Sequence, residues 1–264
     1  MMKLNMFILL VLFVTAPQLS ATAYAAPSES GNQTYLSSAP GPETFLNAAS
    51  HYVSNIFLNT LASLEIISST PEAVQGDWKG IKQYLSQLKS RLPGTYFYIL
   101  PDGNYYSVEK DLTGLNLGDR DYFETLLNGV PVRGFFLLGR SSGKKSCMVA
   151  SPILLDSHVT GALGASIHLD ELQAELNQAF GLPEHYTWFI LDSQGNTVLD
   201  RDPEFISMNA LTQGTTSMQQ AVRTALKNES GQVRYEHGGI MRHAWYQKLP
   251  GMELWMFLAE IQNP

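Results

Sequence analysis

One aromatic pattern of strand and turn occurs twice in this 264-residue chain, and it constrains the fold more than any other feature. Residues 95–104 read TYFYILPDGN, and residues 187–196 read TWFILDSQGN. Each segment is an aromatic, β-rich run followed by residues that favour a turn, and residues 105–108 complete a hairpin after the first copy. The repetition predicts two similar antiparallel-sheet modules.

Helical patterns precede the first copy and separate the strands. Apolar residues recur at helical spacing over 43–67, and Asp77 is placed to cap a second helix that Pro93 and Gly94 end. Further strands are expected at 134–138, 146–155, 159–167, 232–236, 240–247 and 253–260, and further helices at 170–179 and 216–227. The predicted fold class is α+β, with a long N-terminal helix ahead of two antiparallel-sheet modules.

The N-terminal segment has the three parts of a signal peptide. Lys3 supplies a positive charge, residues 7–14 form an unbroken apolar run, and Ala23-Tyr24-Ala25 gives a small-x-small cleavage site. We expect cleavage after Ala25, a flexible leader over 26–42, and export of a soluble protein to the periplasm or the exterior. A membrane span needs about 20 apolar residues, so a retained anchor is the less favoured alternative.

Charge, cysteine content and motifs exclude several classes of function. The chain has 17 Lys and Arg against 24 Asp and Glu, with no basic cluster, which argues against nucleic-acid binding. Cys147 is the only cysteine, so it forms no intramolecular disulfide, and its place in a predicted strand is typical of a small buried hydrophobe. The six histidines lack metal-ligand spacing, and no nucleophile elbow or phosphate-binding loop occurs. We therefore expect neither an enzyme nor a cofactor.

Two nearby segments carry the best functional signal. Residues 118–123 read GDRDYF, and residues 139–144 read GRSSGK. Together they supply guanidinium groups, aromatic rings and hydroxyls, which are the groups that hold a small anion. The pattern indicates binding rather than catalysis.

The order of these segments across residues 43–260 resembles the double Cache family, which are extracytoplasmic PAS-like sensor domains of chemoreceptors and histidine kinases. The resemblance rests on the aromatic hairpin at 95–108, on NLGDRDYF at 116–123, on Gly139 to Gly143, and on ASPI at 150–153 leading to VTGALGASI at 159–167. It implies a helical segment at 43–93, a first, membrane-distal-like module at 94–182, and a second, membrane-proximal-like module at 183–262.

The resemblance also implies a ligand site in the first module. Arg120 would face a carboxylate, Tyr122 would add a hydroxyl donor, and Phe123 would form a wall that excludes water. In relatives that sense dicarboxylates, a Ser/Thr-Thr-Gly segment approaches the ligand, and Ser141 and Ser142 fall at that position. Arg140 lies beside them in the same segment and belongs to the predicted ligand contacts.

Ser166 bears on the type of ligand. Relatives that sense amino acids carry an Asp there to pair the α-ammonium group, and Ser166 offers no such charge. Burial of an ammonium group without a partner would carry a desolvation cost of a few kcal/mol. We therefore expect a small organic acid rather than an amino acid, with Ser166 among the ligand contacts.

Each of these residues also has a structural alternative. Arg120 could form surface ion pairs with Asp119 and Asp121, the aromatic pair could be core, and the serines could be only a hairpin turn. Two other functional classes also remain open: a hydrolase with an unrecognised site, and an interaction module with no ligand. The expected partners of a sensor are a membrane receptor, kinase or transporter, and the expected oligomeric state is a monomer or weak homodimer.

Overall fold

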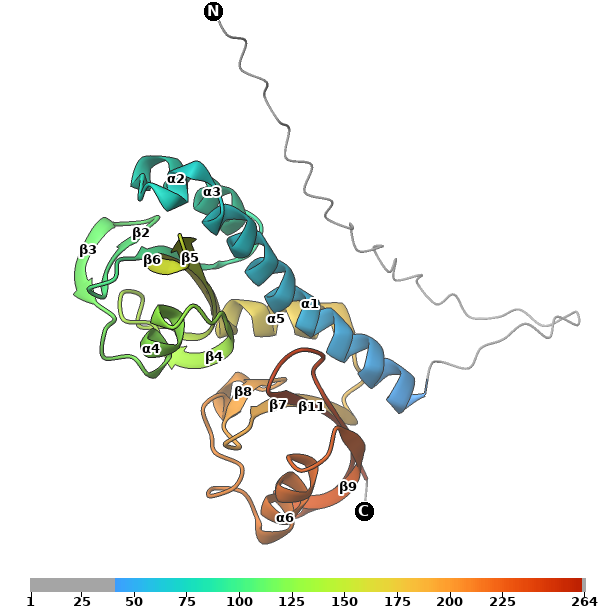
Figure 1. The fold of residues 1–264 in the computed structure, drawn as a ribbon. Helices are drawn as coiled ribbons and strands as arrows, with labels where there is room; N and C mark the ends of the chain where they lie inside the picture. Colours follow the sequence, from blue (N-terminus) through green and yellow to red (C-terminus); the bar gives the residue numbers. More distant parts are fainter. Residues whose placement is uncertain (1–40, 263–264) are drawn as a thin grey trace, which may run out of the picture. The chain divides into compact units, whose positions relative to one another are not determined.

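The computed structural model describes residues 41–262, and the predicted signal peptide and most of the predicted leader lie outside this range. Figure 1 shows a long first helix beside two separate sheets. The helices are α1 (Pro42–Ser68), α2 (Pro71–Val74), α3 (Trp78–Lys89), α4 (Asp121–Leu127), α5 (Leu169–Phe180) and α6 (Thr216–Ala225), with a 3₁₀ turn, η1 (Pro203–Phe205).

The six-stranded first sheet has the order β3-β2-β1-β6-β5-β4, and all neighbouring strands are antiparallel. Its strands are β1 (Gly94–Ile99), β2 (Asn104–Ser107), β3 (Asp111–Asn116), β4 (Val132–Leu138), β5 (Lys145–Leu155) and β6 (His158–His168). The five-stranded second sheet has the order β8-β7-β11-β10-β9, again antiparallel. Its strands are β7 (Tyr186–Asp192), β8 (Thr197–Asp200), β9 (Ser230–His237), β10 (Ile240–Lys248) and β11 (Leu254–Ile261).

Local sequence explains where the first helices begin. Pro42 occupies the first turn of α1, where its missing N–H costs nothing, and Glu43 places a negative charge at the same end. Asp77 caps α3 by accepting a hydrogen bond from the Lys79 N–H at 3.1 Å, as the sequence predicts.

The principal apolar core joins α1 to both sheets. Along α1, residues such as Val53, Phe57 and Leu64 are fully buried, and they belong to one cluster with side chains of β5 and β6 and of β7 and β11. A second cluster fills the space between the second sheet and α6, and a third fills the space between the first sheet and α4. Each sheet therefore has one face on the common core and another face covered by a short helix.

The predicted helices and strands are confirmed, and the structure adds short elements that were not expected, among them α2, β3, β8 and η1. β3 was not expected, because most of its residues are exposed and lack apolar alternation. α2 forms where the sequence predicted only the end of the first helix, and Thr70 caps it by accepting from the Ala73 N–H at 3.3 Å. Cys147 is fully buried in β5, and burial raises the pKa of its thiol to about 12, so its interpretation as a small hydrophobe is confirmed.

Replacement of a core residue of α1 should test how much the fold depends on this helix. Leu64→Ala removes a fully buried side chain and should lower the free energy of unfolding by about 2–5 kcal/mol. Ile66→Ala, on the same helix but 47% exposed, should change it by less than about 1 kcal/mol. Chemical denaturation measures both, and equal losses would contradict this account of the core.

Candidate functional site

The first sheet brings together most of the predicted ligand contacts on the face covered by α4. Six of the seven predicted residues line one pocket there: Arg120, Tyr122, Arg140, Ser141, Ser142 and Ser166. Thr95, Phe97, Tyr105 and Leu117 are among the other lining residues. These side chains come from the start of α4, from the β4–β5 turn and from β6. Segments distant in sequence therefore converge as the resemblance implied.

Arg120 is the least satisfied charged group of this pocket. Its Nη2 donates to the Leu138 carbonyl oxygen at 2.9 Å, while its Nε is buried and has no hydrogen-bond partner in the described part of the chain. Within residues 41–262 it forms no ion pair with Asp119 or Asp121, so the alternative of a surface ion pair is wrong. A buried guanidinium N–H without an acceptor carries a desolvation cost that a bound anion would offset.

Arg140 is the group that binds Asp119. One guanidinium nitrogen lies 2.8 Å from a carboxylate oxygen of Asp119, and the other donates to the Asn116 carbonyl. The hydrogen bond from Arg140 lowers the pKa of the Asp119 carboxyl. Lys144 is likewise occupied, because it pairs with Glu171 and Asp170 and does not line the pocket. Arg120 is thus the cation left for an anionic ligand.

Hydroxyl groups are the other polar side-chain groups that line the pocket. Tyr122 is 4% exposed and packs edge-on against Phe135, and burial raises its pKa to about 12, so the hydroxyl keeps its proton at neutral pH. Ser141 and Ser142 lie in the tight turn between β4 and β5, where Ser142 Oγ accepts from the Lys144 N–H at 3.3 Å. The serines therefore both shape a hairpin turn and face the pocket.

Phe123 does not join this site, and the site itself is narrow. Phe123 lines a separate small hollow with Leu126 and Val159, on another side of α4. The open volume at Arg120 is about 20 Å³, which accommodates little more than one water molecule. A metabolite can enter only if the surrounding segments move apart.

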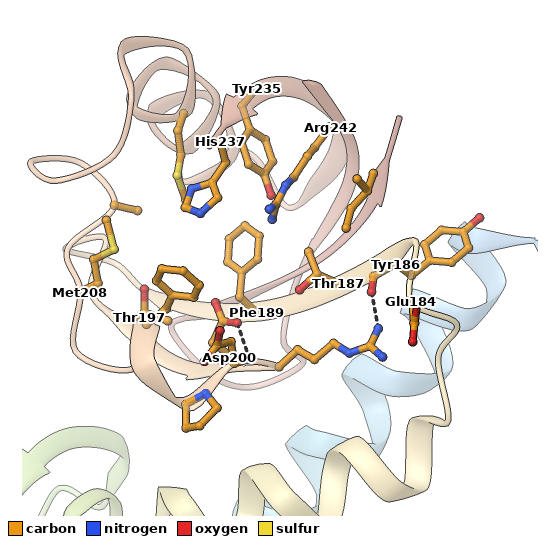
Figure 2. Close-up of a pocket in the computed structure, with 17 residues that line it drawn as sticks. Glu184, Tyr186, Thr187, Phe189, Thr197, Asp200, Met208, Tyr235, His237 and Arg242 are labelled. Atoms are coloured by element: carbon orange, nitrogen blue, oxygen red, sulfur yellow. Dashed lines mark hydrogen bonds between the residues drawn. The ribbon is translucent and has the colours of Figure 1, made fainter. Parts of the chain in front are cut away.

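A larger cavity, of about 440 Å³, lies on the second sheet and was not predicted from the sequence (Figure 2). It occupies the face that α6 covers and extends beneath the segment between β8 and α6. Phe189, Phe205, Met208 and Met218 supply apolar walls. Asp200, Tyr235, His237 and Arg242 supply polar groups, and the volume falls within the usual range of small-molecule sites.

Asp200 is a buried acid at the edge of this cavity. One carboxylate oxygen accepts from the Asp202 N–H at 2.9 Å, and no cation forms an ion pair with the carboxyl among residues 41–262. Burial raises its pKa to about 7. The hydrogen bond from the Asp202 N–H opposes this rise, as does the charge of Arg242, whereas the charge of the Asp202 carboxylate adds to it. Near neutral pH this carboxyl exists in both protonation states.

Arg242 and Tyr235 face each other from neighbouring strands. The two residues are directly paired between β10 and β9, and Figure 2 shows the Tyr235 hydroxyl turned toward the Arg242 guanidinium. Within residues 41–262, Arg242 Nε and the Tyr235 hydroxyl have no hydrogen-bond partner. Burial raises the pKa of Tyr235, and the nearby Arg242 guanidinium opposes this rise. No carboxylate within the described range pairs with Arg242.

Arg201 lines the same cavity but has a structural role. Its guanidinium donates to the backbone carbonyl of Pro183 at 2.8 Å, to that of Leu182 at 3.0 Å, and to that of Tyr186. Its donors are used to hold the segment that leads from α5 into β7. Within residues 41–262 the Arg242 guanidinium makes no comparable set of bonds to backbone carbonyls.

One signal in the sequence pointed to the second cavity. When the two aromatic strands are aligned, Thr187 and Phe189 correspond to Thr95 and Phe97. All four line pockets, two on each sheet. The repeated pattern therefore marks equivalent faces of the two sheets, and the second face could have been examined for a site as well as the first.

Comparison with known proteins agrees with this architecture. The family model of the Cache domain matches residues 28–263. The chain belongs to this family. The resemblance to double Cache sensors and the α+β fold are thereby confirmed, and Cache domains are sensor and ligand-binding domains rather than catalytic ones. Curated protein sequences include no significant match.

Solved structures of other Cache sensors share the fold at low sequence identity. The extracellular domain of a protein described as a histidine kinase, rpHK1S-Z16, aligns with a TM-score of 0.68 at 17% identity, covering 82% of this chain and 91% of that one. The V. cholerae histidine kinase DctB sensor domain gives 0.61 at 17% identity, covering 84% and 96%. The Pseudomonas fluorescens chemoreceptor CtaA ligand-binding domain, in complex with L-isoleucine, gives 0.64 at 12% identity, covering 82% and 89%.

Two further observations describe residues 41–262. None of the helices there combines the length and apolar character required to cross a membrane. In the same range, His, Cys, Asp and Glu side chains form no group of three or more that is arranged to hold a metal ion.

The buried acid of the second sheet predicts a pH-dependent stability. The Asp200 pKa is raised in the folded state above its unfolded value of about 3.9, so its contribution is complete below that value and is lost as pH rises through about 7. Between pH 4 and 7.5 the wild type should lose on the order of 3–4 kcal/mol relative to Asp200→Asn, which cannot ionise.

Denaturant titrations of both proteins across that range measure the difference. Asp202, His237 and Arg242, which lie around the carboxyl, are present in both proteins, so the comparison isolates Asp200. Parallel stability curves for the two proteins would show that the carboxyl is not shifted in the folded state.

Proposed function

We propose that this Cache protein is an exported sensor that binds a small organic acid at the Arg120 pocket of the first sheet. The observation that carries the proposal is the guanidinium of Arg120, whose Nε is buried without a partner in a pocket lined by hydroxyls. A carboxylate has the charge and the two oxygens that match this planar group of donors.

The surrounding groups favour an acid without an amine. Tyr122 donates from a hydroxyl that stays protonated, and Ser141 and Ser142 add hydroxyls from the β4–β5 turn. Ser166, paired with Thr95 across β6 and β1, is 5% exposed and offers no charge to an ammonium group. A buried ammonium at this point would lack a counter-ion, whereas a carboxylate would meet Arg120.

Binding is coupled to a conformational change in this mechanism. The pocket holds only about 20 Å³, so the β4–β5 turn moves outward to admit a ligand and closes over it once bound. Arg140 joins the turn to Asp119, and this exposed ion pair is weak enough to open. The ligand then shifts the population toward the closed state to the extent that it binds that state more tightly.

Signal output requires a partner outside this domain. The similar domains of known structure belong to histidine kinases and chemoreceptors. A protein carrying a signal peptide would work outside the cytoplasm and present its ligand-bound form to a membrane receptor, kinase or transporter. It would do so as a monomer or a weak homodimer.

Replacement of Arg120 tests the ligand site directly. A thermal-shift screen of residues 26–264 against organic acids, amino acids, amines and purines should find an acid that stabilises the protein, by about 2.7 kcal/mol at 100 times its dissociation constant. Arg120→Ala should abolish that shift and keep a cooperative melt. Arg133→Ala, which removes an exposed arginine of β4, should respond as the wild type does.

Two results would contradict the assignment. One is the absence of any stabilising acid, and the other is an equal response of wild type and Arg120→Ala to every compound that binds. Consumption of a bound acid on long incubation would instead favour the hydrolase alternative.

Removal of the Asp119 carboxylate, which pairs with Arg140, should strengthen ligand binding. Asp119→Asn releases Arg140 and removes a negative charge near the incoming carboxylate, so the dissociation constant of the stabilising acid should fall a few-fold. Asp121→Asn removes an equal charge on the other side of Arg120, at the start of α4, and makes the matched control. Isothermal titration at low salt compares them, and identical changes in the two variants would argue against a role for the Asp119–Arg140 pair.

A further inference from the structure

The cavity on the second sheet contains a guanidinium group, Arg242, and a buried carboxyl group, Asp200, that form no ion pair with each other or with other residues of 41–262. Arg242 is always ionised, and none of its nitrogens forms an ion pair within residues 41–262. Asp200 is 9% exposed and has a single hydrogen bond, from the Asp202 N–H. Asp200 is buried, and Arg242 is half-buried with an Nε that water does not reach. Polar groups withdrawn from water normally have partners, so these two groups at one cavity indicate a site built for a ligand that contacts both.

The two charges lie apart within the same cavity. Asp200 ends β8 and pairs in register with Phe189 on β7, whereas Arg242 lies on β10 opposite Tyr235. Figure 2 shows the Arg242 and Tyr235 groups on one side of the Phe189 ring and Asp200 on the other. They are near enough for Arg242 to lower the Asp200 pKa, yet they form no ion pair. A ligand that contacts both must therefore carry its own two charges a short distance apart.

The remaining walls suit an apolar body. Phe205 packs edge-on against His237 with ring centroids 5.3 Å apart, and Met208 and Met218 lie at the same cavity. Methionine side chains adapt to apolar groups of different shape. The volume of about 440 Å³ is sufficient for an amino acid with an aliphatic or aromatic side chain.

We propose that this cavity binds a second ligand, a zwitterion of the amino-acid class, whose carboxylate contacts Arg242 and Tyr235 and whose ammonium group contacts Asp200. The apolar part of the ligand lies against Phe205 and the two methionines. This site is separate from the Arg120 pocket, so the two proposals stand or fall independently. The protein then has one site for an acid on the first sheet and one for a zwitterion on the second.

Matched sets of ligands test the requirement for both charges. Leucine is compared with 4-methylpentanoate, which lacks the amine, and with 3-methylbutylamine, which lacks the carboxylate. Phenylalanine is compared with 3-phenylpropanoate and 2-phenylethylamine in the same way. Each amino acid should bind at least about tenfold more tightly than either analogue, because each analogue leaves one buried charge unpaired.

Isothermal titration is performed on the full exported chain and on its Arg120→Ala variant, so that binding at the first sheet is recognised by its loss. The zwitterion signal should persist in Arg120→Ala, and Arg242→Met and Asp200→Asn should each weaken it at least about tenfold. Arg234→Met is the control, because Arg234 is exposed and neighbours Tyr235 on β9 but pairs with His243, on the opposite face.

Three results would overturn the proposal. In the first, neither amino acid binds the Arg120→Ala protein at concentrations up to about 10 mM. In the second, the amino acids bind less than about tenfold more tightly than their analogues. In the third, Arg242→Met and Asp200→Asn leave the dissociation constant unchanged. The comparison of analogues needs no change to the cavity, so it decides the matter even if a cavity variant fails to fold.

Discussion

The packing of α1 against both sheets is the interaction on which the rest of the structure depends. A sheet with an apolar face must bury that face against another element. Helix α1 buries one face of each sheet in a common core that contains Phe57 and Leu64 from α1 and Trp188 from β7. Because that core buries one face of each sheet, the opposite face can carry a short helix and a pocket. The positions of the two pockets thus follow from how the core is closed.

The arginines of the two pocket faces divide by what their donors meet. Arg201 donates to three backbone carbonyls and holds a connection in place, and Arg140 forms an ion pair with Asp119. Arg120 and Arg242, one at each pocket, instead have a buried Nε with no hydrogen-bond partner among residues 41–262. Buried donors are nearly always satisfied in folded proteins. Among the unsatisfied groups of residues 41–262, these two are the guanidinium groups that line pockets, so ligand chemistry is expected there.

Much of the fold followed from the sequence, and the misses have physical causes. The helices and most strands have apolar periodicity, whereas β3 is an exposed edge strand with little apolar content, so no pattern revealed it. Six predicted site residues converge at one pocket. Phe123 does not, because consecutive residues on α4 point in directions about 100° apart, and Tyr122 already faces the pocket.

The sequence by itself determined the two-sheet architecture, since alternation, turn residues and the repeated aromatic strand act over short distances. The order of motifs also pointed to Arg120 and the serine turn, which the fold brings to one pocket. The tertiary structure alone decided which charges remain unpaired and how much space surrounds them. Asp200 and Arg242 lie on strands that are not neighbours, and the pockets differ between about 20 and about 440 Å³. Both properties arise from side chains that meet only when the sheets and helices pack.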